Sequence, residues 1–236
     1  MPPARSDASG DSLNLVTQCD AGPWPSVSRH ATRYHGTMLE QRIEQHFIDS
    51  ADLKYQSAQI LSKPIAAAIQ AILASVTSGG KVLACGNGGS AADAQHFAAE
   101  FVGRYERERP ELAAIALTTD SSILTAIAND YDFNVIFSKQ VRAFGGAGDV
   151  LLALSTSGNS GNVLAAIEAA HEREMTVVAL TGKSGGKITH ALRETDVHIC
   201  VPHERTARIQ EVHLLVLHCI CDGVDAQLLG DQETLI

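Results

Sequence analysis

The sequence has few aromatic residues, few prolines and no long apolar run. Only 5% of its 236 residues are aromatic and seven are proline, against nineteen glycines and 45% hydrophobic residues. These proportions are typical of a soluble globular protein and exclude collagen, a coiled coil and a chain that is disordered throughout. No apolar run approaches the roughly 18 to 20 residues of a membrane helix, so we expect no membrane-spanning segment.

Positively charged residues are fewer than negatively charged ones, and the number of cysteines is odd. Eighteen Lys and Arg against 27 Asp and Glu give a net charge of −9, and an acidic surface without a basic patch predicts no direct nucleic-acid binding. The five cysteines show neither a CxxC pair nor a zinc-knuckle spacing. We expect reduced, buried thiols and a cytoplasmic location.

The first 37 residues differ in composition from the rest of the chain. They mix Pro, Gly, Ser and Asp without a sustained period, and they lack the apolar stretch of a signal peptide. We predict a disordered extension over residues 1–37 and a single domain over residues 38–236. Met38 opens the first periodic segment and is an alternative translation start.

Two helices are predicted before the first strand. Leu39, Ile43, Phe47, Ile48 and Ala51 follow steps of three and four residues, which places them on one face of an amphipathic helix. Pro64 is expected to open a second helix, which the glycines at 79 and 80 end.

Five short apolar runs then alternate with helical stretches. The runs read KVLAC, LAAIALT, DVLLALS, TVVALTG and DVHICVP, and RTARIQEVHLLVLHCICDGVDAQLL reads as a long closing helix. Runs that are apolar on both faces favour parallel strands covered by helices on each side. The predicted fold class is α/β, a doubly wound sheet of five parallel strands with N-terminal helices.

Ligands of such a sheet bind beyond the carboxyl ends of the strands, where two unusual loops lie. The first, residues 86–90, reads GNGGS and brings main-chain amides close to a ligand. The second, residues 155–160, reads STSGNS and carries hydroxyls at a strand-to-helix junction that favours an anion. Together they predict a phosphate site, with tight turns as the alternative explanation.

Two nucleotide-binding patterns are matched only in part. Residues 86–91 fit a permissive dinucleotide fingerprint, but no acidic residue ends the following strand at the expected offset. The GKS at 182–184 resembles the end of a Walker A loop, yet Val177 stands where the first glycine belongs.

Polar residues on two helices form a possible metal site. His96 and Glu100 lie four residues apart on the helix after the first loop, and the closing helix carries Gln210, His213 and His218 in an apolar stretch. His, Glu, Gln and His fit a ligand set for zinc, and a solvated helix face is the alternative explanation for His96 and Glu100. Because eight helical residues rise about 12 Å, Gln210 and His218 share an ion only through extended side chains or from two copies of the chain. His213 lies on another face and is expected to be a structural or interface residue.

Four segments resemble the phosphoheptose isomerases, a family of sugar-isomerase (SIS) domain enzymes. They are GNGGSAADAQHFAAEFVGRYERERP, ALTTDSSILTAIANDYDFNVIFSKQ, GDVLLALSTSGNSGN and ARIQEVHLLVLHCICD. The resemblance spans Met38 to the C-terminus and implies conversion of sedoheptulose 7-phosphate to D-glycero-D-manno-heptose 7-phosphate, a precursor of lipopolysaccharide core. It also implies a homotetramer with its sites between subunits.

The same resemblance implies roles for individual residues. Glu100 and His218 would be the acid/base groups, and His96, Glu100, Gln210 and His218 would hold Zn²⁺. The implied substrate contacts are Asn87, Gly88, Gly89, Glu100, Asn129, Asp130, Ser155, Thr156, Ser157, Ser160 and Gln210.

Two other functions remain open at this stage. An adaptor in the same family binds the DnaA replication initiator, and its motif has a small residue in place of Glu100 and asparagine in place of His218. Both catalytic residue types are present here, which favours the isomerase. A transcriptional regulator with an SIS domain would add a basic helix-turn-helix segment, and no such segment is found.

Overall fold

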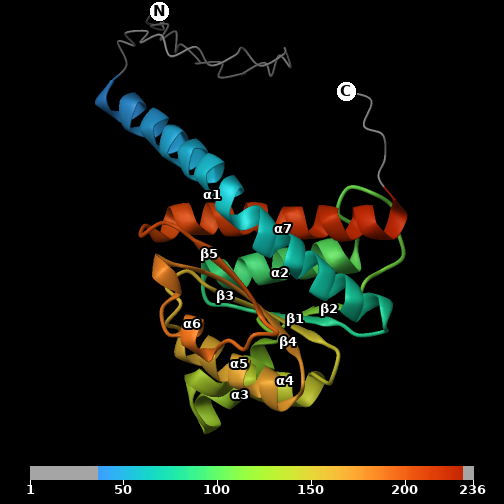
Figure 1. The fold of residues 1–236 in the computed structure, drawn as a ribbon. Coiled ribbons are helices and arrows are strands. Elements are labelled where there is room, and N and C mark those ends of the chain that lie inside the picture. Colours follow the sequence, from blue (N-terminus) through green and yellow to red (C-terminus); the bar gives the residue numbers. More distant parts are fainter. Residues whose placement is uncertain (1–36, 231–236) are drawn as a thin grey trace, which may run out of the picture. The chain divides into compact units, whose positions relative to one another are not determined.

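The computed structural model describes residues 37–230, and its centre is a sheet of five parallel strands in the order β2-β1-β3-β4-β5 (Figure 1). Pairing starts in register from Val82 of β1 opposite Ala114 of β2 and Val150 of β3. The predicted fold class and all five predicted strands are confirmed. Their bounds are β1 Val82–Cys85, β2 Ala114–Ala116, β3 Val150–Ser155, β4 Thr176–Gly182 and β5 Val197–Val201.

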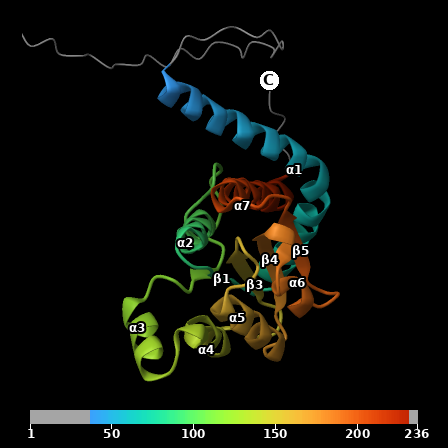
Figure 2. The same cartoon turned by 90° about the vertical axis from the view of Figure 1, so that its left-hand side faces the viewer.

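Helices cover both faces of this sheet (Figure 2). One face packs against α1 (Met38–Thr77), α2 (Gly89–Val102) and α7 (Thr206–Leu229). The other packs against α4 (Ile136–Phe144), α5 (Gly161–Glu172) and α6 (Ile188–Ala191), with α3 (Ser121–Asp130) at its edge. Short 3₁₀ turns are η1 (Phe133–Val135) and η2 (Lys183–Gly185). Successive residues of a strand therefore enter different cores, as Leu151 and Leu152 do.

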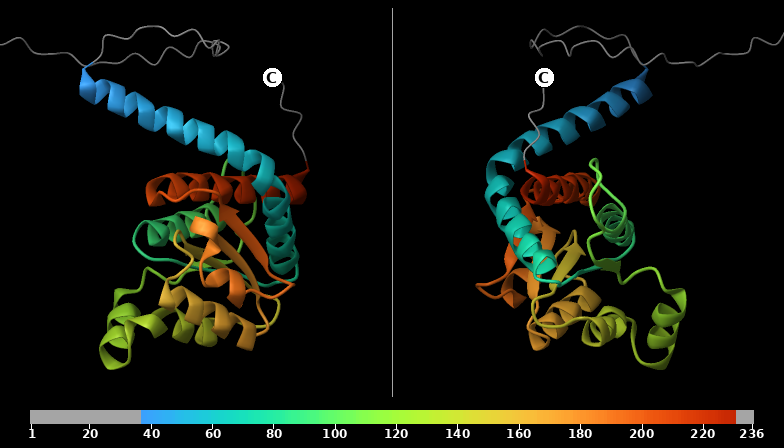
Figure 3. Two further views of the ribbon diagram at one scale, coloured as in Figure 1. Left: turned by 60° about the vertical axis from the view of Figure 1, so that its left-hand side comes forward. Right: turned by 90° about the vertical axis from the view of Figure 1, so that its right-hand side faces the viewer.

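The prediction of two helices before the first strand is wrong. The structure has one helix of 40 residues, α1, with Pro64 inside it. Proline removes one backbone hydrogen bond and costs about 3 kcal/mol within a helix, and Figure 3 shows α1 bending along its length. Burial of Leu61 and Ala68 on the two sides of Pro64 offsets that cost, so the helix continues through it.

The two halves of α1 differ in their surroundings. In the second half, Leu61, Ala68 and Ile72 are buried against the sheet and α7. In the first half, the expected packing face is uncovered within one chain, and the exposed fractions of Leu39, Phe47 and Ile48 are 65%, 74% and 45%. An amphipathic helix stripe exposed in this way predicts a contact with another protein surface.

The chain divides into two units, residues 1–37 and 38–236, and the second is described here by itself. The expected disorder of residues 1–37 falls, except for Thr37, outside the described range and stays a prediction. Within that range, α1 and α7 are long and apolar enough to cross a bilayer by length and composition alone. Core helices meet the same criterion, and α7 buries Ile209, Val216 and Ile220 against α1 and the sheet.

Candidate active site

The two predicted ligand-binding loops lie side by side at the carboxyl ends of β1 and β3. These strands are neighbours, and the connections from them run to opposite faces, to α2 and to α5. Such a position is the topological switch point at which doubly wound sheets bind ligands. Gly88 has φ of +56°, a conformation that glycine adopts without strain, and α2 begins at the next residue.

A reciprocal amide pair joins the two loops. The Asn87 side chain donates to Asn162 Oδ1 and accepts from Asn162 Nδ2, both at 2.8 Å. Asn162 is 2% exposed in the first turn of α5. The pair fixes the separation of the loops, so Asn162 is a site residue that the sequence analysis missed. Its signal, an asparagine two residues after the loop of residues 155–160 (the serine loop), is indistinguishable from turn chemistry.

The serine loop holds its hydroxyls around the start of α5. Ser155 Oγ and Ser160 Oγ are 2.9 Å apart, and Ser157 Oγ accepts from the Asn159 amide at 3.2 Å. Ser155 is buried, while Thr156, Ser157 and Ser160 are half-buried and border the first N–H groups of the helix. Free helix N–H groups and hydroxyls together suit a phosphate. The GKS segment instead forms the short turn η2 after β4 and starts no long helix, unlike a Walker A loop.

Three predicted catalytic or metal-binding side chains converge where α2 packs along α7. His96 Nε2 lies 3.0 Å from His218 Nε2 and 3.4 Å from Glu100 Oε1. The His96 and Glu100 side chains are 40% and 21% exposed, so solvent and a small molecule can reach them. We call this cluster of His96, Glu100 and His218 the helix seam.

Gln210 contacts the first turns of α2, at Gly89 and Asp93. Its Nε2 donates to Asp93 Oδ2 at 3.2 Å, and its amide packs so closely on Gly89 that a Cβ there would meet it at 2.3 Å. Burial raises the pKa of the Asp93 carboxyl, while the Gln210 hydrogen bond and the neighbouring His96 act in the opposite direction. Gly89 therefore leaves room for Gln210 beside the glycine loop.

His213 has a structural role, as expected. It is fully buried and its Nε2 donates to the carbonyl of Thr181 in β4 at 2.9 Å, which fixes the tautomer. Burial lowers the pKa of His213 to about 4. His213 thus points into the sheet, away from the helix seam.

Asn129 and Asp130 are not brought to the seam or to the serine loop by any contact in the part of the chain that the structure describes. They are exposed at the end of α3, and the Asn129 amide donates to Asp130 Oδ1 at 2.9 Å. A cleft of about 180 Å³ adjoins residues 86–90 (the glycine loop); its lining includes Asn87, Gly88 and Phe133 but neither Asn129 nor Asp130.

Comparison with known proteins identifies both the domain and several relatives named phosphoheptose isomerase. The sequence profile of the SIS domain matches residues 46–182. The chain is 72% identical over 196 residues to the phosphoheptose isomerase of Methylibium petroleiphilum, which covers 83% of this chain and 98% of that protein.

The chain belongs to the phosphoheptose isomerase family.

Two solved structures of family members share its fold. The phosphoheptose isomerase of Neisseria gonorrhoeae is 57% identical, with a TM-score of 0.77, covering 80% of this chain and 100% of that chain. The one from Francisella tularensis is 44% identical, with a TM-score of 0.78, covering 80% and 99%.

The helix seam fits part of the zinc site that the family resemblance implies. Two imidazole nitrogens on one tetrahedral zinc ion lie roughly 3.3 Å apart, close to the 3.0 Å between His96 and His218. Among residues 37–230, no three His, Cys, Asp or Glu side chains are arranged to hold one ion. The two imidazoles are therefore spaced as two ligands of one ion would be, Glu100 Oε1 lies 3.4 Å from His96 Nε2, and Gln210 is hydrogen-bonded to Asp93.

Proposed function

We propose that this chain is an aldose–ketose isomerase that converts sedoheptulose 7-phosphate to D-glycero-D-manno-heptose 7-phosphate in the cytoplasm, for lipopolysaccharide core synthesis. One observation supports it most strongly. Glu100 Oε1 and His218 Nε2, from different helices, lie within 3.4 Å of the same His96 nitrogen. A carboxylate and an imidazole thus lie beside the same His96 ring. The same domain carries the serine loop, whose hydroxyls and free helix N–H groups suit a phosphate.

The reaction needs two kinds of proton transfer. A ketose becomes an aldose when a proton leaves C1, another is delivered to C2, and one moves between the two oxygens through an enediol. Glu100 carries the proton between the carbon atoms, since a carboxylate accepts and returns it on one face of the sugar. His218 serves the oxygens, because an imidazole can both accept and donate a proton.

The serine loop would hold the substrate phosphate while Asn87 and the glycines at 88 and 89 border the sugar. Hydroxyls of Ser155, Thr156, Ser157 and Ser160 and the free N–H groups of α5 supply the donors. Asn129 and Asp130 are exposed, which is compatible with their serving a site between subunits.

We also propose that His96, Glu100, Gln210 and His218 hold Zn²⁺. A zinc ion at this position would act as a Lewis acid and stabilise the negative charge that develops on the sugar oxygens. Glu100 keeps one carboxylate oxygen for the substrate, because a carboxylate with both oxygens on a metal is a weak base. Gln210 must exchange its hydrogen bond to Asp93 for this role.

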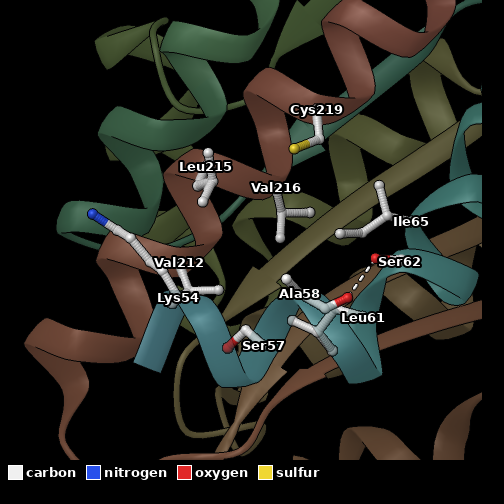
Figure 4. A pocket seen from close by; sticks show the side chains of 10 residues that line it. All are labelled: Lys54, Ser57, Ala58, Leu61, Ser62, Ile65, Val212, Leu215, Val216 and Cys219. Atoms are coloured by element: carbon white, nitrogen blue, oxygen red, sulfur yellow. Dashed lines mark hydrogen bonds between the residues drawn. The ribbon is translucent and has the colours of Figure 1, made fainter. Parts of the chain in front are cut away.

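The exposed stripe of α1 supports assembly into a homotetramer. Figure 4 shows the side chains that line a mostly apolar groove between α1 and α7, where Ala58, Leu61 and Ile65 lie opposite Val212 and Val216. A second copy of the chain, presenting its own α1, is the occupant that we propose for the stripe and groove. Light scattering of the intact chain is expected to give the mass of four chains.

Turnover of sedoheptulose 7-phosphate before and after chelation tests activity and metal together. We expect the purified protein to form the aldose phosphate, a chelator to abolish this activity, and added Zn²⁺ to restore it. Activity that survives chelation would refute the requirement for a metal. Absence of activity with Zn²⁺ present would refute the proposed isomerase function. Binding of DnaA-type initiator by an inactive protein would support the adaptor instead, which the presence of both catalytic residue types does not favour.

A further inference from the structure

A buried ion pair joins the loop after α2 to α7. Arg109 Nε lies 2.6 Å from Asp225 Oδ1, and the two side chains are only 1% and 3% exposed. We propose that Arg109 and Asp225 are a positioning pair that sets the distance between Glu100 and His218. The inference rests on the acid/base roles proposed above for these two residues.

Arg109 binds the backbone of Glu100 itself. Its Nη2 donates to the Glu100 carbonyl at 2.7 Å and its Nη1 to the Phe101 carbonyl at 2.9 Å. The last carbonyls of a helix have no partner within it, so the guanidinium completes the end of α2. The rotation and depth of the turn that carries Glu100 are therefore fixed by Arg109.

Asp225 fixes the other side of the seam. It follows His218 by seven residues, two turns along the same face of α7, about 10 Å away. Its Oδ2 is buried and has no hydrogen-bond partner within the described residues, so Arg109 is what holds this carboxylate. The same loop also brings the Tyr105 ring to 5.7 Å from the His218 ring, measured between centroids.

Stability alone does not require this pair. Burial of two charges has a desolvation cost that often equals their attraction, and two apolar residues of similar size can replace such a pair without loss. Apolar residues cannot reproduce the directed bonds from one guanidinium fork to Asp225 and to the carbonyls of Glu100 and Phe101. The function of the pair is therefore to define geometry.

A charge-free double variant separates the two roles. In Arg109→Met with Asp225→Leu, no charge is left unpaired, so we expect a melting temperature within a few degrees of the parent. Because the bonds to the end of α2 are lost, kcat should fall about 10- to 100-fold. KM for sedoheptulose 7-phosphate should stay within about twofold, since neither residue touches the serine loop.

A conservative variant covers the case in which the double variant does not fold. Arg109→Lys keeps the charge opposite Asp225 but loses the fork, so we expect the protein to stay folded with a melting temperature lower by several degrees and a fall in kcat of about tenfold. The matched control is Arg142→Met, which breaks the exposed ion pair with Glu172 and should leave both quantities unchanged.

A parental kcat in a folded double variant, or in Arg109→Lys where the double variant is unfolded, would overturn the inference. So would a rise in KM that accounts for the whole loss of kcat/KM. Glu100→Gln, measured in parallel, distinguishes failure of the catalytic role from failure of the positioning role. If Glu100→Gln retains full turnover, the proposed catalytic role fails; if only the Arg109 variants do, the positioning role alone fails.

Discussion

The two walls of the candidate site are built in different ways. The phosphate wall consists of main-chain amides and hydroxyls from residues 155–160, which are adjacent in sequence and tied to a strand end. The acid/base wall consists of side chains from α2 and α7, with His96 and His218 separated by 122 positions. With the roles proposed above, substrate binding would depend on one local loop, whereas catalysis would depend on how two helices pack. Variants in the two walls should separate KM from kcat.

The largest effect is expected in the acid/base wall. Glu100→Gln keeps the size of the side chain and removes the base, so kcat should fall about 10²- to 10⁴-fold with little change in KM. Steady-state kinetics with sedoheptulose 7-phosphate measure both, and Glu172→Gln on the exposed face of α5 is the matched control. A normal kcat in Glu100→Gln would contradict the role assignment.

Lowering the pH tests whether the packing of α7 can be weakened through His213, which lies outside the helix seam. Its pKa is about 4 in the folded protein and near 6.5 when unfolded, so below pH 6.5 the unfolded chain binds the extra proton. The free energy of unfolding should decrease by roughly 3 kcal/mol as the pH falls from 6.5 to 4, at about 1.4 kcal/mol for each pH unit.

Urea unfolding at a series of pH values measures this dependence. In His213→Gln, which can still donate to the Thr181 carbonyl, the contribution of His213 should vanish and the slope should flatten. An unchanged slope would show that other groups cause the acid sensitivity.

The smallest effect is expected in the phosphate wall. Ser155→Ala removes one hydroxyl of the pair with Ser160 and leaves the backbone donors of α5 in place, so KM should rise about tenfold while kcat stays within about twofold. Ser184→Ala, an exposed serine of the turn after β4, is the control. A fall in kcat equal to that of Glu100→Gln would remove the distinction between the two walls.

Local patterns in the sequence predicted much of the fold. The five strands and α7 could be read from period and length, because runs apolar on both faces fit only a covered parallel sheet. Pro64 misled the same reasoning, since burial on both sides of it, which a local pattern does not contain, outweighs the lost hydrogen bond.

The sequence by itself determined which chemical groups are present and on which elements they lie: a glycine loop, a hydroxyl loop, and imidazoles and a carboxylate on helices. Only the tertiary structure decided that His96 meets His218, that Asn162 joins the two loops and that Arg109 reaches Asp225. The physical reason is that these contacts depend on the depth and rotation at which helices pack. Both are set by the whole core, and no short segment specifies them.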